Sequence, residues 1–329
     1  MMGDTTTPPR AKLLLAFAAV YLIWGSTYLA IRFAIETLPP FLMAGARFMV
    51  AGTILYAVAR ARGAKRPSRV HWITAFVVGA LLLLGGNGGV VWAEQRVPSG
   101  VTALLVALVP CWMVLLDWAR PGGSRPAAQV FIGLLLGLAG LTWLIGPDAI
   151  MGGGRVDLLG AAVLGFASLS WAAGSIYSRH SPMPSEPLLS IGMQQLGGGV
   201  CLMVFALLVG DLGRLDLAAV SSRSALAVVY LIAFGSIIGF SAYMWLLRVS
   251  TPARASTYAY VNPIVAVLLG WALAGEALTA RIAVAAAVIV AGVALITTAP
   301  KKADLKREPR QRGERKRPRE PVSSSTLSE

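Results

Sequence analysis

Two halves of this chain repeat one another, and the duplication constrains the fold more than any other feature of the sequence. With a shift of 147 residues, four positions meet the same residue type again: Trp24 and Trp171, Arg32 and Arg179, Pro40 and Pro187, Gly52 and Gly199. With a shift of 153 residues, three more pairs match: Gly86 and Gly239, Trp92 and Trp245, Pro110 and Pro263. Self-similarity at a nearly constant offset predicts two structural units of the same kind.

The apolar content of both halves indicates a membrane protein. The 329 residues are 56% hydrophobic and only 13% charged, whereas about a quarter of the residues in a soluble domain are charged. A helix needs about 20 apolar residues to cross a bilayer. Ten such stretches are predicted, near residues 12–31, 40–59, 71–92, 99–118, 128–146, 158–178, 188–209, 225–247, 253–274 and 280–298.

Each half holds five spans, and this odd number predicts that the second half lies upside down relative to the first. The expected fold is an all-α polytopic membrane protein, with ten transmembrane helices forming two inverted five-helix repeats around a central cavity. Secondary transporters are often built this way, with the substrate site between the repeats near mid-membrane. The predicted segments are a cytoplasmic N-terminal segment (1–11), repeat 1 (12–146), an outer linker (147–157), repeat 2 (158–298) and a disordered basic cytoplasmic tail (299–329).

The positions of lysine and arginine predict that both termini are cytoplasmic. With the N-terminus inside, 22 of the 29 basic residues fall on the cytoplasmic side, ten of them between Lys301 and Arg319. Cytoplasmic loops of membrane proteins carry such an excess. A basic, proline-containing tail beside a span is typical of a segment that touches anionic lipid, so the net charge of +14 does not indicate a nucleic-acid partner.

Several classes of chemistry lack the residues they need. The two histidines, His71 and His180, are too few for a histidine metal site or a Ser–His–Asp triad in the membrane. No GxxxxGK sequence is present to bind ATP. Cys111 and Cys201 both lie in apolar stretches, which does not favour a structural disulfide. We therefore expect no enzyme activity, no metal and no cofactor.

Several stretches resemble the EamA type of the drug/metabolite transporter superfamily over residues of about 12–298. They are IWGSTYLAIRFAI with PPFLMAGARF, VPSGVTALLVALVP, and TPARASTYAYVNPIVAVLLGWALAGEALT followed by AGVALI. In the first half, PGGSRP stands where the acidic residue matching GEALT (Gly275–Thr279) would be. The resemblance implies ten helices around a cavity and export of small metabolites or drugs through the bacterial inner membrane. It does not imply one substrate.

Helix breaks and amides mark candidate cavity positions. Pro110 and Pro263 lie near the middle of corresponding spans, and proline removes one helix hydrogen bond. Interrupted segments at matching positions of two repeats point to a transporter site, although a packing kink is the alternative. Asn262 and Asn87 are polar positions without polar counterparts in the other half. Each binds substrate or bonds a neighbouring helix.

Two charged residues are candidates for ligand and ion chemistry. Arg47 lies roughly 10 Å inside the predicted membrane core. Its repeat counterpart is the uncharged Gln194, which is also a candidate for the cavity wall. Arg47 is expected either to hold a substrate carboxylate or to pair internally with Glu36 or Glu94. Glu94, at the end of a glycine-broken span, is the candidate for coupling to H⁺, with a solvated interfacial carboxylate as the alternative.

Aromatic residues supply the remaining candidates for the wall of the cavity. Flat rings suit an amphipathic or aromatic cargo, although many membrane tryptophans only form an interfacial belt. The candidates from the predicted cavity spans are Trp24, Tyr28, Trp112, Trp171, Tyr243 and Tyr258.

The sequence thus predicts a secondary active transporter that exports small metabolites, such as amino acids, by alternating access. Broad drug efflux and a small-metabolite importer or facilitator are the alternatives. The expected partners are a small-molecule substrate, H⁺ as a coupling ion and membrane lipid. GxxxG pairs at Gly133–Gly137 and Gly235–Gly239 pack helices within a monomer or form the face of a homodimer.

Overall fold

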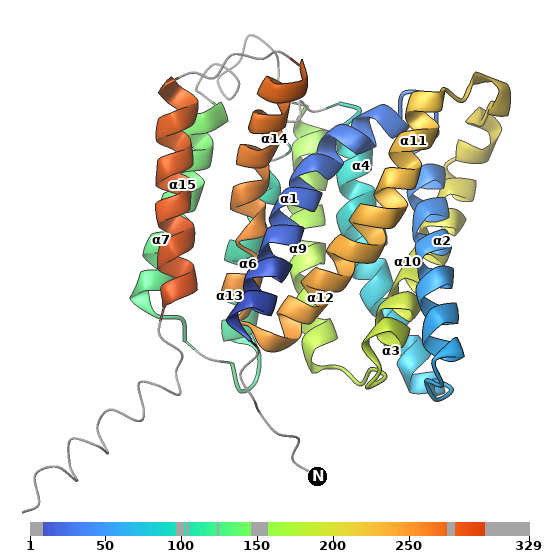
Figure 1. The fold of residues 1–329 in the computed structure, drawn as a ribbon, viewed down its shortest axis with the longest axis horizontal. Helices are drawn as coiled ribbons and strands as arrows, with labels where there is room; N and C mark the ends of the chain where they lie inside the picture. The colour runs from blue at the N-terminus through green and yellow to red at the C-terminus, as the bar shows by residue number, and fades with distance from the viewer. Residues whose placement is uncertain are drawn as a thin grey trace, which may run out of the picture.

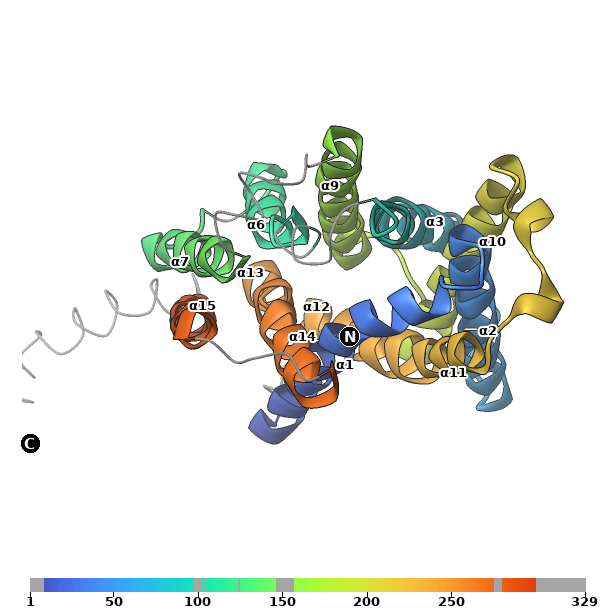
Figure 2. The same ribbon diagram turned by 90° about the horizontal axis from the view of Figure 1, so that it is seen from above.

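The computed structural model describes residues 9–96, 102, 105–123, 125–145, 157–274 and 280–299, and over these the chain forms helices and no strand. The sequence-predicted outer linker, the basic tail beyond residue 299 and the GEALT motif (Gly275–Thr279) lie outside the described residues. Figures 1 and 2 show a bundle of steeply inclined helices lying side by side. Helix α1 begins and helix α15 ends at the same end of the bundle (Figure 1), which we call the terminal end.

The helices of the first half end near residue 145. They are α1 (Arg10–Ala34), α2 (Pro40–Ala61), α3 (Arg69–Gly79), the π-helical η1 (Ala80–Gly88), α4 (Gly89–Ala93), α6 (Val109–Ala119) and α7 (Ala128–Ile145). The second half begins with α9 (Leu158–His180) and α10 (Pro187–Leu208), followed by two short 3₁₀ turns, η2 (Asp211–Arg214) and η3 (Leu217–Ala219). Then come α11 (Ser222–Tyr230), the π-helical η4 (Leu231–Gly239), α12 (Phe240–Val249), α13 (Pro252–Ala255), α14 (Tyr258–Ala274) and α15. Helix α15 spans Ala280–Thr298.

The outside of the bundle is apolar, as a bilayer requires. Leu15 on α1, Leu135 on α7 and Leu208 on α10 are 70%, 68% and 78% exposed. Six helical runs of the described chain are long and apolar enough to cross a membrane: Arg10–Ala34, Pro40–Ala61, Arg69–Ala93, Leu159–His180, Pro187–Leu208 and Ser222–Val249. Shorter apolar helices accompany them. The chain is therefore a polytopic all-α membrane protein, while the count of ten spans stays a prediction.

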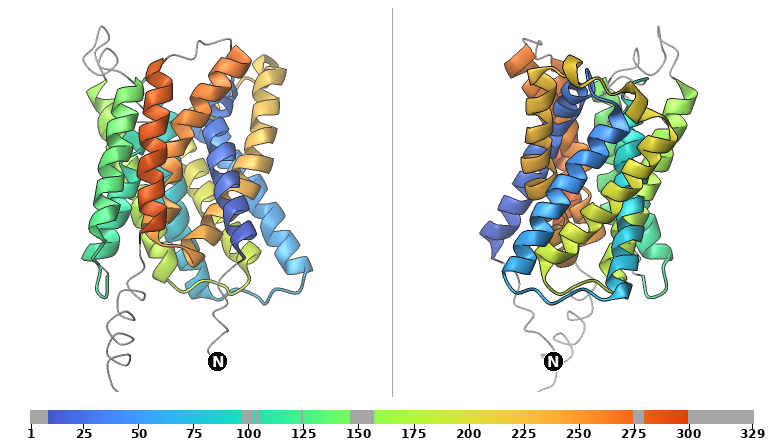
Figure 3. Two further views of the ribbon diagram at one scale, coloured as in Figure 1. Left: turned by 60° about the vertical axis from the view of Figure 1, so that its left-hand side comes forward. Right: turned by 90° about the vertical axis from the view of Figure 1, so that its right-hand side faces the viewer.

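Helices that match in sequence also pack against each other in opposite directions. Along α2 and α10 the contacts pair Gly45 with Met203, Gly52 with Leu196, and Tyr56 with Gly192, so one number rises as the other falls. Glycines permit this close approach because a side chain would collide with the facing backbone. The last helices of the two halves, α7 and α15, run side by side and antiparallel in the same way (Figure 3).

The third span of each half contains a π-helical stretch of nine residues. The glycine-rich sequence at Gly85–Gly89 indicated only an interruption, and the structure shows that the helix widens without ending. Side chains from neighbouring helices donate to carbonyls of these stretches: Ser170 Oγ to Leu81 O at 2.7 Å, Gln195 Nε2 to Ser236 O at 2.8 Å and Trp24 Nε1 to Gly235 O at 3.2 Å. Widened turns of this kind often occur at functional sites.

The chain at the start of α2 is fixed by a carboxylate from the other half. Pro40 occupies the first turn, where its missing N–H costs no helix hydrogen bond. Asp211 Oδ2 accepts from the backbone N–H groups of Phe41 at 2.9 Å and Leu42 at 3.3 Å. These contacts satisfy two of the unpaired donors of a helix start. They also tie the second half of the chain to the first.

Candidate functional site

A cavity lies inside the bundle between helices of both halves. The space open to the centre of a water molecule is about 90 Å³, and because one water needs roughly 10–15 Å³ by this measure, several waters or a small organic molecule can fit. The lining residues come from α1, α2, η1, α4, α6, α9, η4, α12 and α14. Among them are the sequence-predicted candidates Trp24, Tyr28, Arg47, Asn87, Trp171, Tyr258 and Asn262.

Arg47 is the charged side chain among the lining residues. It is 5% exposed, and its guanidinium lies 4.2 Å from the centre of the Phe48 ring. Within the described chain, Nε and Nη1 have no hydrogen-bond partner. Buried donors without partners are costly in an apolar medium, so the geometry fits an anionic ligand that would supply the missing acceptors.

The internal pairs considered for Arg47 are not formed in the described chain. The Glu36 carboxylate lies 3.7 Å from Arg223 at the surface. Both carboxylate oxygens of Glu94 are shielded from solvent and have no hydrogen-bond partner among the described residues. No carboxylate of the described chain therefore accepts from Nε or Nη1 of Arg47, which lines the cavity.

The two asparagines join neighbouring helices at the cavity wall. Asn87 Oδ1 on η1 accepts from Arg47 Nη2 on α2 at 3.4 Å, so it holds the guanidinium against the wall. With its amide nitrogen turned toward α1, Asn262 on α14 donates to the carbonyls of Tyr21 at 3.2 Å and Tyr258 at 3.0 Å. Both amides thus have interhelical partners as well as a place in the cavity lining.

Four aromatic rings pack together on the terminal side of the cavity. The Trp24 ring lies 5.5 Å from Trp171, 5.0 Å from Tyr243 and 4.9 Å from Tyr258, measured between ring centres. Such edge and tilted contacts are the favourable geometries of aromatic pairs. Tyr243 is fully buried and lies outside the lining, so it supports the lining rings from below. We call Trp24, Trp171, Tyr243 and Tyr258 the aromatic floor.

The hydroxyl of Tyr243 fastens the aromatic floor to its surroundings. It accepts from Trp171 Nε1 at 3.1 Å and shares a hydrogen bond of 2.6 Å with Ser175 Oγ. Met113 packs beneath it, with its sulfur 3.9 Å away, and Met113 and Ser175 are fully buried. These buried side chains form a packed layer on that side of the cavity. Sequence reasoning missed Ser175, because a serine one turn from a tryptophan has no distinctive pattern.

Glu94 lies immediately after α4, just beyond the lining residue Val90. Its carboxyl group interacts electrostatically with Arg32 and with Tyr28. Tyr28 lines the cavity. A shielded carboxyl without partners favours its protonated form, which is the property required of a coupling group.

The remaining candidates lie away from the cavity lining. Gln194 is buried against α3 and donates to Ser190 Oγ at 3.2 Å. Trp112 packs in the main core, and its Nε1 has no partner among the described residues. Pro110 follows a turn and stands in the first turn of α6, whereas Pro263 lies inside the continuous α14. The matched prolines therefore differ in local structure, although Val106, whose carbonyl Pro110 leaves unbonded within the helix, lines the cavity.

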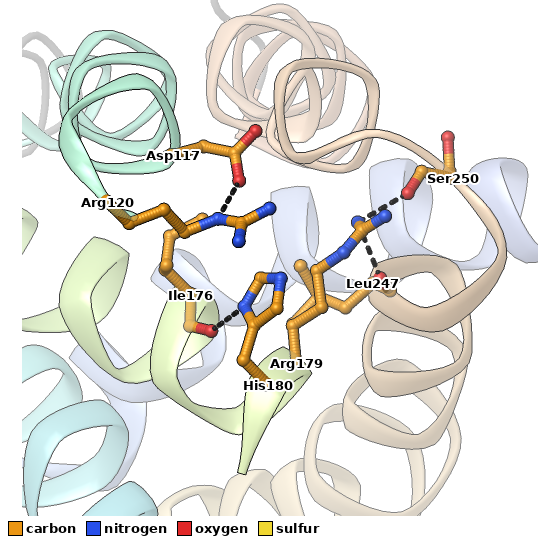
Figure 4. Close-up of polar contacts among 7 residues, drawn as sticks. All are labelled: Asp117, Arg120, Ile176, Arg179, His180, Leu247 and Ser250. Atoms are coloured by element: carbon orange, nitrogen blue, oxygen red, sulfur yellow. Dashed lines mark hydrogen bonds and ion pairs between the residues drawn. The ribbon is translucent and has the colours of Figure 1, made fainter. Parts of the chain in front are cut away.

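A polar cluster lies beneath the aromatic floor at the terminal end (Figure 4). Arg179 Nη1 at the end of α9 donates to the carbonyls of Leu247 at 2.8 Å and Ser250 at 2.5 Å at the end of α12. Asp117 Oδ1 accepts from Arg120 Nε at 2.7 Å on α6. Figure 4 shows that these residues come from the ends of α6, α9 and α12. No three His, Cys, Asp or Glu side chains of the described chain gather closely enough to hold a metal ion.

Comparison with known proteins identifies the family. The model of the EamA-like transporter family matches residues 11–146 and again residues 158–298. This chain belongs to the EamA-like transporter family. It is 42% identical to the "uncharacterized inner membrane transporter YedA" of Escherichia coli strain K12, over 86% of this chain and 89% of that protein. It is 25% identical to a "probable amino-acid metabolite efflux pump" of the same strain, over 83% and 91%.

The fold is also similar to a solved one. A crystal structure that is 23% identical covers 88% of this chain and 97% of its own, with a TM-score of 0.71. Family, relatives and apolar spans together make this EamA-like protein a multi-pass inner-membrane transporter. Its small-molecule substrate and lipid surroundings follow from that class.

Proposed function

We propose that this EamA-like protein is a secondary active carrier that exports small carboxylate-bearing metabolites, amino acids or related compounds, by alternating access. The observation that carries the proposal is Arg47, buried at the cavity wall with two donors unpartnered in the described chain. A guanidinium binds carboxylates with paired, charge-assisted hydrogen bonds. The efflux of amino-acid metabolites named for one relative agrees with this substrate class.

The proposed topology has both termini in the cytoplasm. The basic residues near the terminal end of the described chain include Arg60, Arg62, Lys65, Arg66 and Arg69 in and after α2. At the other end, Arg223 and Arg214 each pair with an acidic residue. This asymmetry supports a cytoplasmic terminal end. The aromatic floor then closes the cavity toward the cytoplasm, and the conformation described here is the one from which an exported substrate would leave.

Alternating access is supported by the antiparallel packing of the matched helices. Because α2 and α10 correspond in sequence and run in opposite directions, an exchange of conformations between the two halves would close one end and open the other. The ten-helix inverted repeat is part of this proposal. Glu94 is the proposed site of H⁺ coupling, since its carboxyl oxygens are shielded from solvent and have no hydrogen-bond partner among the described residues.

The proposal is tested with purified protein in proteoliposomes. A panel of labelled monocarboxylates and amino acids is screened, together with matched amides and amines. A carrier shows saturable uptake and counterflow, in which unlabelled substrate on the far side accelerates entry of label. Counterflow with carboxylates and none with the matched amides supports the proposal. Linear, non-saturable flux would indicate a channel and overturn it.

The second candidate is broad drug efflux, and the aromatic floor is the observation that favours it. Rings in tilted and edge contact offer apolar contact that does not discriminate between ligands. A drug carrier would transport cationic and neutral aromatic compounds in the same panel. Rescue of cells from toxic amino-acid analogues, but not from aromatic cations, would separate metabolite export from drug efflux.

A further inference from the structure

An arginine at the terminal end of the bundle joins two helix ends, and the other repeat contains its sequence equivalent. Arg179 is the last arginine of α9, and its Nη1 bridges the carbonyls of Leu247 and Ser250 (Figure 4). Carbonyls in the last turn of a helix have no partner within the helix. A guanidinium fits them well, because it carries several donors and its charge is favourable at the negative helix end. Arg179 therefore ties the end of α9 to the end of α12.

Arg179 and its acceptor Leu247 each have a sequence equivalent in the first repeat, at the other end of the bundle. The shift of 147 residues that matches Trp24 with Trp171 also matches Arg32 with Arg179, and the shift of 153 that matches Trp92 with Trp245 assigns Leu247 to Glu94. Arg32 lies in the last turn of α1, and Glu94 follows the last residue of α4. By position in the sequence, these two helix ends correspond to the ends of α9 and α12.

The two arginines are in different states in this conformation. Arg179 makes two hydrogen bonds. Arg32 is exposed. Its side chain makes neither a hydrogen bond nor an ion pair with any other residue that the structure describes. Its positive charge nevertheless acts on the Glu94 carboxyl group, which follows α4. Arg179 is thus hydrogen-bonded to the end of the third span of its repeat, and Arg32 is not.

We propose that Arg179 and Arg32 are reciprocal positioning residues of the transport cycle, each fastening the end of its own helix to the end of the third span of its repeat. In the conformation described here, Arg179 holds the terminal end closed. In the opposite conformation, Arg179 releases α12 and Arg32 donates to the main-chain carbonyl of Glu94 at the end of α4. This inference rests on the proposed alternating access, and it assigns a role to two arginines that lie outside the cavity lining.

The acceptor on both sides is a main-chain oxygen, which separates this role from proton coupling. Glu94→Gln keeps the carbonyl and so leaves the fastening by Arg32 in place. The Glu94 carboxylate only adds attraction for the guanidinium. At the terminal end, the Asp117 carboxylate likewise attracts the Arg179 guanidinium.

The test measures the balance between the two conformations rather than transport alone. Thr27, which lines the cavity on α1, is replaced by cysteine in a background with Cys111→Ser and Cys201→Ser. A membrane-impermeant thiol reagent is applied from the outside, and the labelling rate reports the fraction of protein whose cavity faces outward. The measurement needs no substrate.

Replacement by methionine keeps an unbranched side chain and removes every donor and the charge. Arg179→Met is expected to slow outside labelling by roughly tenfold, which corresponds to the loss of about one charge-assisted hydrogen bond. Arg32→Met is expected to change labelling in the opposite direction, or to leave it at an already maximal rate while slowing counterflow. The double variant should label at a rate between those of the two single variants.

Two other arginines serve as matched controls. Arg60 at the terminal end donates to the main-chain carbonyl of Ala64 beyond its own helix, and Arg214 at the other end pairs with Asp211. Among the described residues, neither side chain makes a hydrogen bond or an ion pair with a third span. Arg60→Met and Arg214→Met remove the same charge at the same ends and should leave the labelling rate of wild type. General destabilisation would instead move all four variants in one direction.

The inference is overturned if Arg179→Met and Arg32→Met shift labelling in the same direction, or if neither differs from its control. Failure of the proposed function has a different signature. A protein that is not a carrier shows no counterflow even in wild type, whereas a carrier with other fastenings shows wild-type counterflow and no opposing shifts in labelling.

Discussion

Arg47 Nη2 on α2 donates to Asn87 Oδ1 on η1 at 3.4 Å, and Nε and Nη1 have no hydrogen-bond partner in the described chain. The long hydrogen bond orients the group without saturating it. Nε and Nη1 are already desolvated in the folded protein. The free-energy cost of desolvating them when a carboxylate binds is therefore small.

The first prediction concerns this arginine. Arg47→Gln should leave insertion and folding intact and raise the half-saturating concentration of carboxylate substrates by on the order of 10- to 100-fold, the worth of a charge-assisted pair. Arg47→Lys should retain part of the affinity, because an ammonium keeps the charge but not the planar fork. Counterflow in proteoliposomes measures both. Wild-type affinity in Arg47→Gln would remove Arg47 from the substrate site.

The second prediction concerns the hydroxyl that fastens the aromatic floor. Tyr243→Phe and Ser175→Ala each remove one end of the 2.6 Å hydrogen bond between these side chains. A double-mutant cycle on thermal unfolding in detergent should give a coupling free energy of about 0.5–1.5 kcal/mol. Additive effects would show that the two hydroxyls do not interact. Tyr260→Phe, at a buried tyrosine of another core cluster, serves as the control pair with Ser175→Ala and should give additive effects.

The third prediction concerns the contact between α3 and α10. A Cβ atom at Gly79 would lie 2.3 Å from the backbone nitrogen of Gly198 and 2.5 Å from the carbonyl of Gln194, so the helices must separate to accept it. Gly79→Ala should destabilise the protein by about 1–3 kcal/mol, the usual cost of overpacking. Gly165→Ala in α9 is the matched control, because nothing lies within 4 Å of its Cβ.

That control should be neutral or stabilising, since alanine is the better helix former by up to about 1 kcal/mol. Thermal unfolding in detergent measures both variants. Equal melting temperatures for Gly79→Ala and Gly165→Ala would mean that the close approach of α3 and α10 does not limit stability.

The fourth prediction is a pH dependence at the start of α9. The backbone N–H of Gly160, with further help from Leu159 and Arg96, holds the pKa of the Asp157 carboxyl group below its ordinary value of 3.8. A lowered pKa in the folded state means that this carboxylate contributes stability above the pKa of the unfolded chain. That contribution is lost as the pH falls through the lower, folded pKa.

Asp157→Asn is the informative variant, because asparagine is an equally good N-cap but does not titrate in this range. Wild type should lose more of its melting temperature than Asp157→Asn when the pH falls from 5 toward 3 in steps of about half a unit. Parallel curves for the two proteins would show that Asp157 is not a source of acid sensitivity. Asp157→Ala should be less stable than both above pH 5, since it loses the cap itself.

The sequence predicted the features that depend on composition and periodicity. The match between Pro40 and Pro187 anticipated that α2 and α10 would be equivalent helices, and charge in an apolar stretch was enough to select Arg47. Asn87 was selected because it is polar while its repeat counterpart is not, and the structure places it against Arg47. For both side chains, the role in substrate binding stays a prediction.

Features that depend on where helices meet were not predicted. Tyr243 was expected in the cavity wall, yet it lies one layer below, because its position relative to Trp24 depends on the crossing of α1 and α12. The glycines of the third span indicated a break, and only the backbone shows the π-helical widening. Arg179 carried no signal as a bridge, since its acceptors are main-chain carbonyls, and a sequence does not display those.

The last prediction concerns Glu94 and the driving force of transport. Its carboxyl oxygens are shielded and without partners in the described chain, so the group can take up a proton without first breaking a hydrogen bond. If it carries the coupling proton, Glu94→Gln should abolish accumulation driven by a pH gradient, while counterflow, which needs no gradient, continues at a rate near that of wild type. Glu36→Gln, at an exposed carboxylate paired with Arg223, is the control and should retain both activities. Gradient-driven accumulation by Glu94→Gln would place the coupling elsewhere, whereas loss of counterflow as well would mean that Glu94 supports the structure of the site rather than its coupling to protons.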